Sequence, residues 1–190
     1  MTSRHTAFLK FFLFASAALV SSQAAHAQLN SSAATVNLTA SLLERLTLSA
    51  TPGTVNFVLN NGAVTAGSAP VAITTTWLLL STRANVSVYA WFATPAAALT
   101  DSATTPNNIP STEVLGQVTT GTPTSFTAFT QSNTLGTAGG GLKLFTQALS
   151  VTNRSASRSD NLNLQIDLTS QPQLPAGSYA GTLNLQAQAL

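Results

Sequence analysis

Apolar and polar side chains alternate along most of the chain after residue 28, most clearly near the C-terminus. Residues 162–168 and 183–189 each place an apolar side chain at every second position. Successive side chains of a strand point to opposite faces, so this period predicts strands with one buried and one solvated face. Pro172, Pro175 and Gly177 separate the two runs and favour a turn. We therefore expect the chain to end in an antiparallel hairpin with a long loop.

The same pattern predicts further strands earlier in the chain. They cover residues 35–42, 55–59, 71–80, 86–92 and 142–151, with a weak strand at 126–129. The first of them continues through Leu46 and Leu48 after a bulge or bend at Glu44 and Arg45. Turn-forming residues separate them, and the polar stretch 154–160 is interpreted as a turn leading into the final hairpin. No helical period appears after residue 28. The expected fold is all-β: an immunoglobulin-like antiparallel β-sandwich of about eight or nine strands.

The first 27 residues have the pattern of a cleaved helical signal peptide. Arg4 and Lys10 supply positive charge, residues 11–20 are an apolar run, and Ala25 and Ala27 are small residues suited to a cleavage site. The run is shorter than the roughly 20 apolar residues that span a bilayer. We expect a signal peptide over 1–27 and one β-sandwich domain over 28–190. The mature chain should have no membrane span and should be exported to the periplasm, the cell surface or the extracellular space.

Removal of the leader also removes most of the reactive side chains. Both histidines (His5 and His26) lie in it, and the chain has no cysteine. A serine or threonine nucleophile needs a base within reach, and Lys143 alternates with Leu142 and Leu144 as a solvated strand residue does. The remaining five basic and five acidic side chains cancel, which argues against binding to nucleic acid. We predict that the protein is not an enzyme.

The same composition argues against metal and cofactor sites. Zinc, copper and iron sites usually need His or Cys ligands. The stretch 160–163 carries oxygen ligands but lacks the glycine turn and terminal glutamate of a calcium loop. The glycines at 139–141 are not followed by the lysine and helix of a phosphate-binding loop. No metal or cofactor is expected.

Aromatic residues offer one candidate contact surface. Trp77 shares a strand face with Val71 and Ile73, which predicts a core position. Tyr89 and Trp91 lie on the face opposite Val88 and Phe92, so one of these pairs must lie on the outer face or under a loop. If Tyr89 and Trp91 are exposed, they form a patch for carbohydrate or another surface.

The first predicted strand offers a second candidate. Val36, Leu38, Ala40 and Leu42 share one face of residues 35–42, directly after a polar N-terminal stretch. Such a strand can pair within its own sheet or with the sheet edge of a neighbouring molecule. The sequence leaves both alternatives open.

Residues 174–183 (Leu-Pro-Ala-Gly-Ser-Tyr-Ala-Gly-Thr-Leu) support a resemblance. This turn and strand resemble the last hairpin of secreted bacterial pilin-type domains, of which spore-coat-U-like and other chaperone–usher subunits are the nearest group. They also resemble the ending of an uncharacterised secreted bacterial family. The chain lacks the disulfide and the C-terminal aromatic residue usual in chaperone–usher subunits.

The resemblance implies a sandwich that accepts or donates an edge strand. We therefore expect an exported structural or cell-surface protein, a pilin-like or fimbrial subunit that assembles with itself or with another surface protein through sheet edges. The alternative is a secreted, non-catalytic binding module, such as an adhesin or carbohydrate-binding domain, that uses Tyr89 and Trp91.

Overall fold

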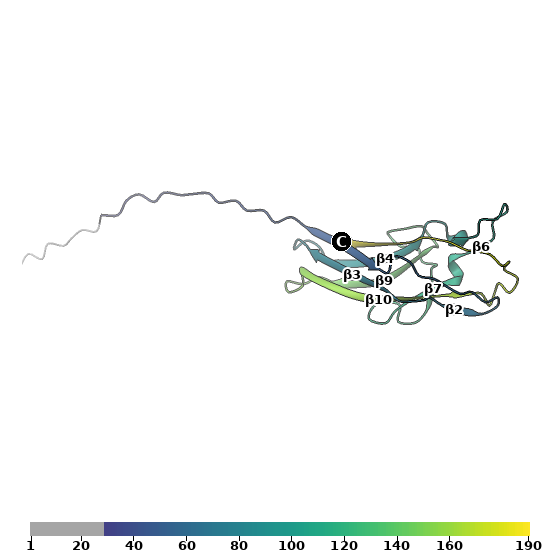
Figure 1. The fold of residues 1–190 in the computed structure, drawn as a ribbon. Coiled ribbons are helices and arrows are strands. Elements are labelled where there is room, and N and C mark those ends of the chain that lie inside the picture. Colours follow the sequence, from purple (N-terminus) through teal and green to yellow (C-terminus); the bar gives the residue numbers. More distant parts are fainter. Residues whose placement is uncertain (1–28) are drawn as a thin grey trace, which may run out of the picture. The chain divides into compact units, whose positions relative to one another are not determined.

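A computed structural model describes residues 29–190, so the predicted signal peptide lies outside the described residues. The chain divides into two units, Met1–Ala40 and Ser41–Leu190. Within the described residues all strands fall in the second unit (Figure 1). Two short 3₁₀ turns, η1 (Pro95–Ala97) and η2 (Ser111–Glu113), are its only helical elements. The strands are β1 (Arg45–Thr51), β2 (Val64–Ala66), β3 (Val71–Leu78), β4 (Asn85–Phe92), β5 (Leu99–Thr100), β6 (Asn108–Ile109), β7 (Val114–Val118), β8 (Thr127–Ala128), β9 (Gly141–Ala148), β10 (Ser155–Asp167) and β11 (Leu183–Ala189).

The strands form two main antiparallel sheets. The larger has the order β1-β3-β10-β7-β8, with β2 paired to the C-terminal part of β10. The smaller has the order β11-β4-β9, and β5 and β6 form a separate two-stranded ribbon. Among the described residues, β1 and β11 are therefore edge strands of different sheets, and the two lie close together.

The core lies between the two sheets. Ile73 from β3 and Leu162 from β10 meet Val88 from β4, and all three are buried. Phe129 is fully buried and packs edge-on against Phe92, with ring centroids 5.3 Å apart. Such packing of two inner faces stabilises a sandwich through apolar burial, without any covalent link.

The structure confirms the predicted all-β antiparallel sandwich, and strands β3, β4 and β9 fall within or close to their predicted ranges. The predicted terminal hairpin is wrong. β10 pairs with β3, β7 and β2, whereas β11 pairs with β4 in the other sheet. The connection between them is long enough to cross from one sheet to the other, and alternation alone does not identify a strand's partner.

Three other stretches also differ from expectation. The predicted turn at 154–160 is wrong, because its residues from Ser155 onward form the first half of β10. Residues 55–59 alternate between half-buried and exposed as expected, but they form no strand. Residues 35–42 also form no strand, and the first strand begins only at Arg45.

Candidate functional site

The first feature that points to function is the uncovered segment before β1. Every residue from Leu29 to Arg45 is exposed. The exposed fractions reach 80% for Val36, 89% for Leu38 and 74% for Leu42. A soluble monomer seldom leaves such a row of large apolar side chains in water, which makes the segment a candidate contact surface.

The sheet itself explains why β1 does not extend back into this segment. β1 pairs with β3 from Arg45 opposite Leu78, so a continued ladder would place Leu43 opposite Leu80. Instead, the Leu80 N–H donates to Glu44 Oε1 at 2.9 Å. The chain then turns, with the Arg83 N–H donating to the Leu80 carbonyl. The partner strand therefore ends where the apolar segment begins.

An ion pair fixes this end of the ladder. Arg83 donates from Nη2 to Glu44 Oε2 at 2.9 Å and from Nε to Glu44 Oε1 at 3.1 Å. The Arg83 hydrogen bonds, followed by the Leu80 N–H, lower the pKa of the Glu44 carboxyl to about 2. Glu44 is therefore charged at any physiological pH. Its ion pair with Arg83 attaches the C-terminal end of the apolar segment to the turn between β3 and β4.

The second feature is an uncharged cleft, lined by both apolar and polar side chains, where the ends of β1 and β11 meet. Its volume is about 840 Å³. Leu183 and Leu185 of β11 line one wall, and Val55, Phe57 and Leu59 line another. Among the residues that the structure describes, no Asp, Glu, Lys or Arg lines it. The cleft therefore presents an uncharged surface beside the edge of β11 that has no strand partner in the described part of the chain.

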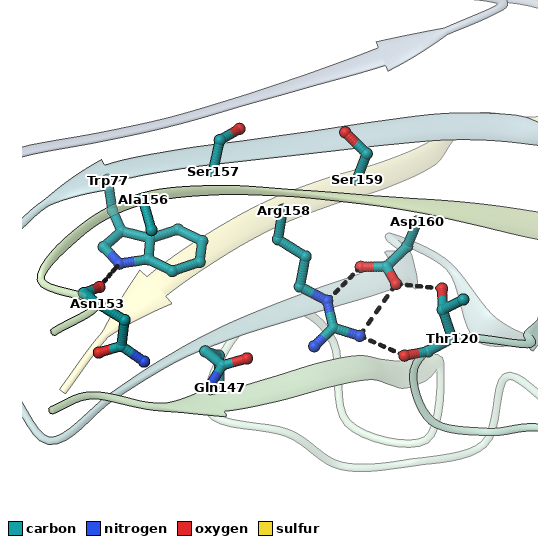
Figure 2. Close-up of a pocket in the computed structure, with 9 residues that line it drawn as sticks. All are labelled: Trp77, Thr120, Gln147, Asn153, Ala156, Ser157, Arg158, Ser159 and Asp160. Carbon is teal, nitrogen blue, oxygen red and sulfur yellow. Dashed lines mark hydrogen bonds and ion pairs between the residues drawn. The ribbon is translucent and has the colours of Figure 1, made fainter.

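The third feature is a polar opening on the side where β10 faces β9, with a volume of about 390 Å³ (Figure 2). Arg158 donates from Nε to Asp160 Oδ2 at 2.7 Å and from Nη2 to Asp160 Oδ1 at 3.0 Å. Thr120 donates from its hydroxyl to Asp160 Oδ1 and accepts from Arg158 Nη2 through its carbonyl. The guanidinium also lies over the Phe145 ring, 4.3 Å from its centroid.

Asp160 is 5% exposed, so it is a charged group almost inside the sandwich. Burial acts to raise the pKa of Asp160, but the hydrogen bonds from Arg158 and Thr120 outweigh it, and the net pKa is lowered. The carboxylate therefore stays ionised at neutral pH because Arg158 and Thr120 satisfy it.

The predicted aromatic contact surface does not appear as an exposed patch. Tyr89 is only 7% exposed, and Trp91 is half-buried. The loop at Gly136 lies directly against the Trp91 indole, and Thr134 donates to Gln188 on the neighbouring β11. The aromatic face therefore lies under a loop, which is one of the two alternatives that the sequence allows. Trp77 is 3% exposed, as predicted, and its indole N–H donates to the Asn153 carbonyl at 2.8 Å.

Between residues 29 and 190, no group of three or more His, Cys, Asp or Glu side chains is placed to hold a metal ion. No helix in that part of the chain is long and apolar enough to cross a membrane. Sequence reasoning found the apolar segment, but it missed the Arg158–Asp160 pair. The signal for that pair was available, because both residues continue the even-numbered series of Leu162, Leu164 and Ile166.

Comparisons with protein-family models, with curated proteins and with solved structures gave no match. The class of the protein therefore follows from its own residues: an all-β sandwich with an uncovered apolar segment and open sheet edges.

Proposed function

We propose that this protein is an exported structural subunit of the cell surface whose copies assemble through their sheet edges. Residues 35–42 of one copy pair along the free edge of β11 in the next copy. Val36, Leu38, Ala40 and Leu42 then face the space between the sheets, which opens into the uncharged cleft at Leu183 and Leu185. The observation that carries the proposal is the exposure of this alternating apolar segment. Export rests on the sequence of the leader.

The dimensions of the two partners support the pairing. Eight extended residues span about 26 Å, at about 3.3 Å per residue. β11 offers seven residues, and its Leu183, Leu185, Ala187 and Ala189 are half-buried at an edge without a second neighbour in the described chain. A strand added there gains a ladder of backbone hydrogen bonds, and its alternate side chains reach the space between the sheets.

Chemical character supports it as well. Residues 28–43 carry no charged side chain, and neither does the cleft. Burial of Val36, Leu38 and Leu42 contributes about 2 kcal/mol each, or roughly 6 kcal/mol together. Association costs an estimated 4–15 kcal/mol in lost freedom, so the ladder must supply the remainder and assembly should depend on concentration.

The geometry also predicts the form of the assembly. The segment and the cleft are different surfaces of one molecule, so the contact joins unlike surfaces head to tail. Such contacts produce rings when they close and open filaments when they do not. This agrees with a fibre-like role.

A pair of charge substitutions tests the proposal. In Leu38→Asp the charge would face the space between the sheets, and burial of an unpaired carboxylate costs several kcal/mol. We expect the concentration needed for assembly of the processed protein to rise by more than about 100-fold. In Thr39→Asp the same charge lies on the solvent side of the strand, so assembly should be nearly unchanged.

Sedimentation velocity and electron microscopy would report the assembly state of both variants. Equal assembly by Leu38→Asp and the unmodified protein, or monomers only at every concentration of the unmodified protein, would show that the proposal is wrong.

A further inference from the structure

Besides the edge of β11 in the smaller sheet, part of strand β10 in the larger sheet also has an edge without a strand partner in the described chain. β3 pairs with β10 from Ser155 to Leu162, but β7 pairs with β10 only from Leu162 to Ile166. Within residues 29–190, residues 155–161 of β10 therefore have a strand neighbour on one side only. An unpaired edge of this length invites pairing with another chain.

The side chains along this edge explain how it differs from β11. Leu162, Leu164 and Ile166 point into the core, and the same face of β10 continues through Asp160 and Arg158. Figure 2 shows Arg158 and Asp160 turned toward Thr120, with Ser157 and Ser159 turned the opposite way. A charged pair therefore occupies the inward positions that apolar residues hold in the rest of the strand.

The Arg158–Asp160 pair makes it energetically unfavourable for an added strand to cover the opening. Arg158 is engaged through Nε and Nη2, whereas its Nη1 makes no hydrogen bond within residues 29–190. The Arg158 side chain keeps 23% of its surface exposed, so water reaches it through the opening. An apolar strand laid along residues 155–161 would remove that water and supply no replacement partner. An unsatisfied charged donor costs more than the 1–3 kcal/mol of a neutral one.

We propose that the Arg158–Asp160 pair, held by Thr120 and Phe145, keeps this edge of β10 from pairing with a second copy. The two lateral openings then have opposite roles: the uncharged cleft at β11 accepts a strand, and the charged opening at β10 rejects one. This inference deepens the proposed function, and its claim about the direction of assembly rests on that function. The rejection of a strand at β10 can be tested without it.

The test uses the full processed chain with Leu38→Asp, which removes assembly through the segment. Because the chain has no cysteine, Ser157→Cys introduces a single thiol on the exposed face beside the edge. Arg158→Met with Asp160→Leu then replaces the ion pair by apolar side chains, an exchange that proteins often tolerate. A short bis-maleimide reports whether two copies meet at this edge.

We expect the apolar double substitution to raise the yield of cross-linked dimer by at least about tenfold, which corresponds to 1.4 kcal/mol. A thiol placed instead at Ser102, in the exposed loop between β5 and β6, should show no such increase. If the folded double variant cross-links no more than its parent, or if the parent already cross-links as strongly, the inference is overturned. Circular dichroism establishes whether each variant is folded. If the double variant Arg158→Met with Asp160→Leu does not fold, Arg158→Met with Asp160→Asn takes its place.

A measurement on the unmodified protein gives an independent answer. In hydrogen exchange, the backbone amides of residues 155–161 that point away from β3, along the open edge, should exchange at the same rate in monomer and assembly. The amides of β11 should become protected on assembly. Protection appearing at residues 155–161 would overturn the inference. Protection at neither edge would leave β10 as inferred and count against the proposed function.

Discussion

Replacement of Arg158 by methionine tests how the charged opening is held together. The substitution keeps most of the apolar stem but removes the guanidinium that donates twice to Asp160. Asp160, at 5% exposure, then retains the Thr120 hydroxyl as its only side-chain donor within residues 29–190. Loss of one partner of a buried ion pair typically costs about 3–5 kcal/mol. Because the Arg158 side chain is itself 23% exposed, we expect the lower end, about 3 kcal/mol.

The loss should depend on pH with a definite sign. In the unmodified protein the pKa of Asp160 is lowered, so its stabilising contribution is present above the unfolded pKa and falls as pH drops through the folded pKa. In Arg158→Met, burial without the guanidinium should raise the pKa of Asp160 above its unfolded value. The variant should then lose stability as pH rises, and the difference from the unmodified protein should shrink between pH 7 and pH 3.

Urea denaturation in a Leu38→Asp background, in which the proposed assembly should not occur, measures this difference at each pH. Arg45→Met is the matched control, because Arg45 is exposed and its loss should change the free energy of unfolding by less than about 0.5 kcal/mol. If Arg158→Met is no more destabilising than Arg45→Met, or if its deficit grows on acidification, the account of the charged opening is refuted.

Two further predictions concern the core and the Glu44–Arg83 ion pair that precedes β1. Phe129→Ala removes a fully buried ring that packs on Phe92, and urea denaturation should show a loss of about 3–5 kcal/mol; a loss below 1 kcal/mol would contradict the packing described. The Glu44 side-chain carboxyl, followed by carbon NMR, should titrate with a midpoint near pH 2, and Arg83→Gln should move that midpoint upward. An ordinary midpoint in the unmodified protein would show that Arg83 does not hold Glu44 in solution.

The fold class could be predicted because alternation and branched side chains directly encode a half-buried strand. Val71, Ile73 and Trp77 share one face in the sequence pattern and are all buried in β3. The partner of each strand could not be predicted in the same way. β10 and β11 alternate equally well whether they pair with each other or cross between sheets, since the pattern records burial and not neighbours.

The residues of the candidate site could be predicted from the sequence only in part, for related reasons. Arg158 and Asp160 suggest a loop when each is considered alone, because single charges avoid the core. They occupy inward positions of β10 because each neutralises the other, which is a property of the folded pair. Tyr89 could not be placed from its strand alone, because the loop that covers its face lies more than 40 residues further along the sequence.

The central claim is that residues 35–42 of one molecule lie along β11 of another. Two single-cysteine proteins test it, one with Asn37→Cys in the segment and one with Gln186→Cys on the exposed side of β11. After the two are mixed and treated with a short bis-maleimide, the account predicts a covalent dimer that joins one of each. It also predicts that Leu38→Asp in the first partner abolishes this dimer. If no mixed dimer forms at concentrations where the protein assembles, or if the dimer persists with Leu38→Asp, the segment does not pair with β11.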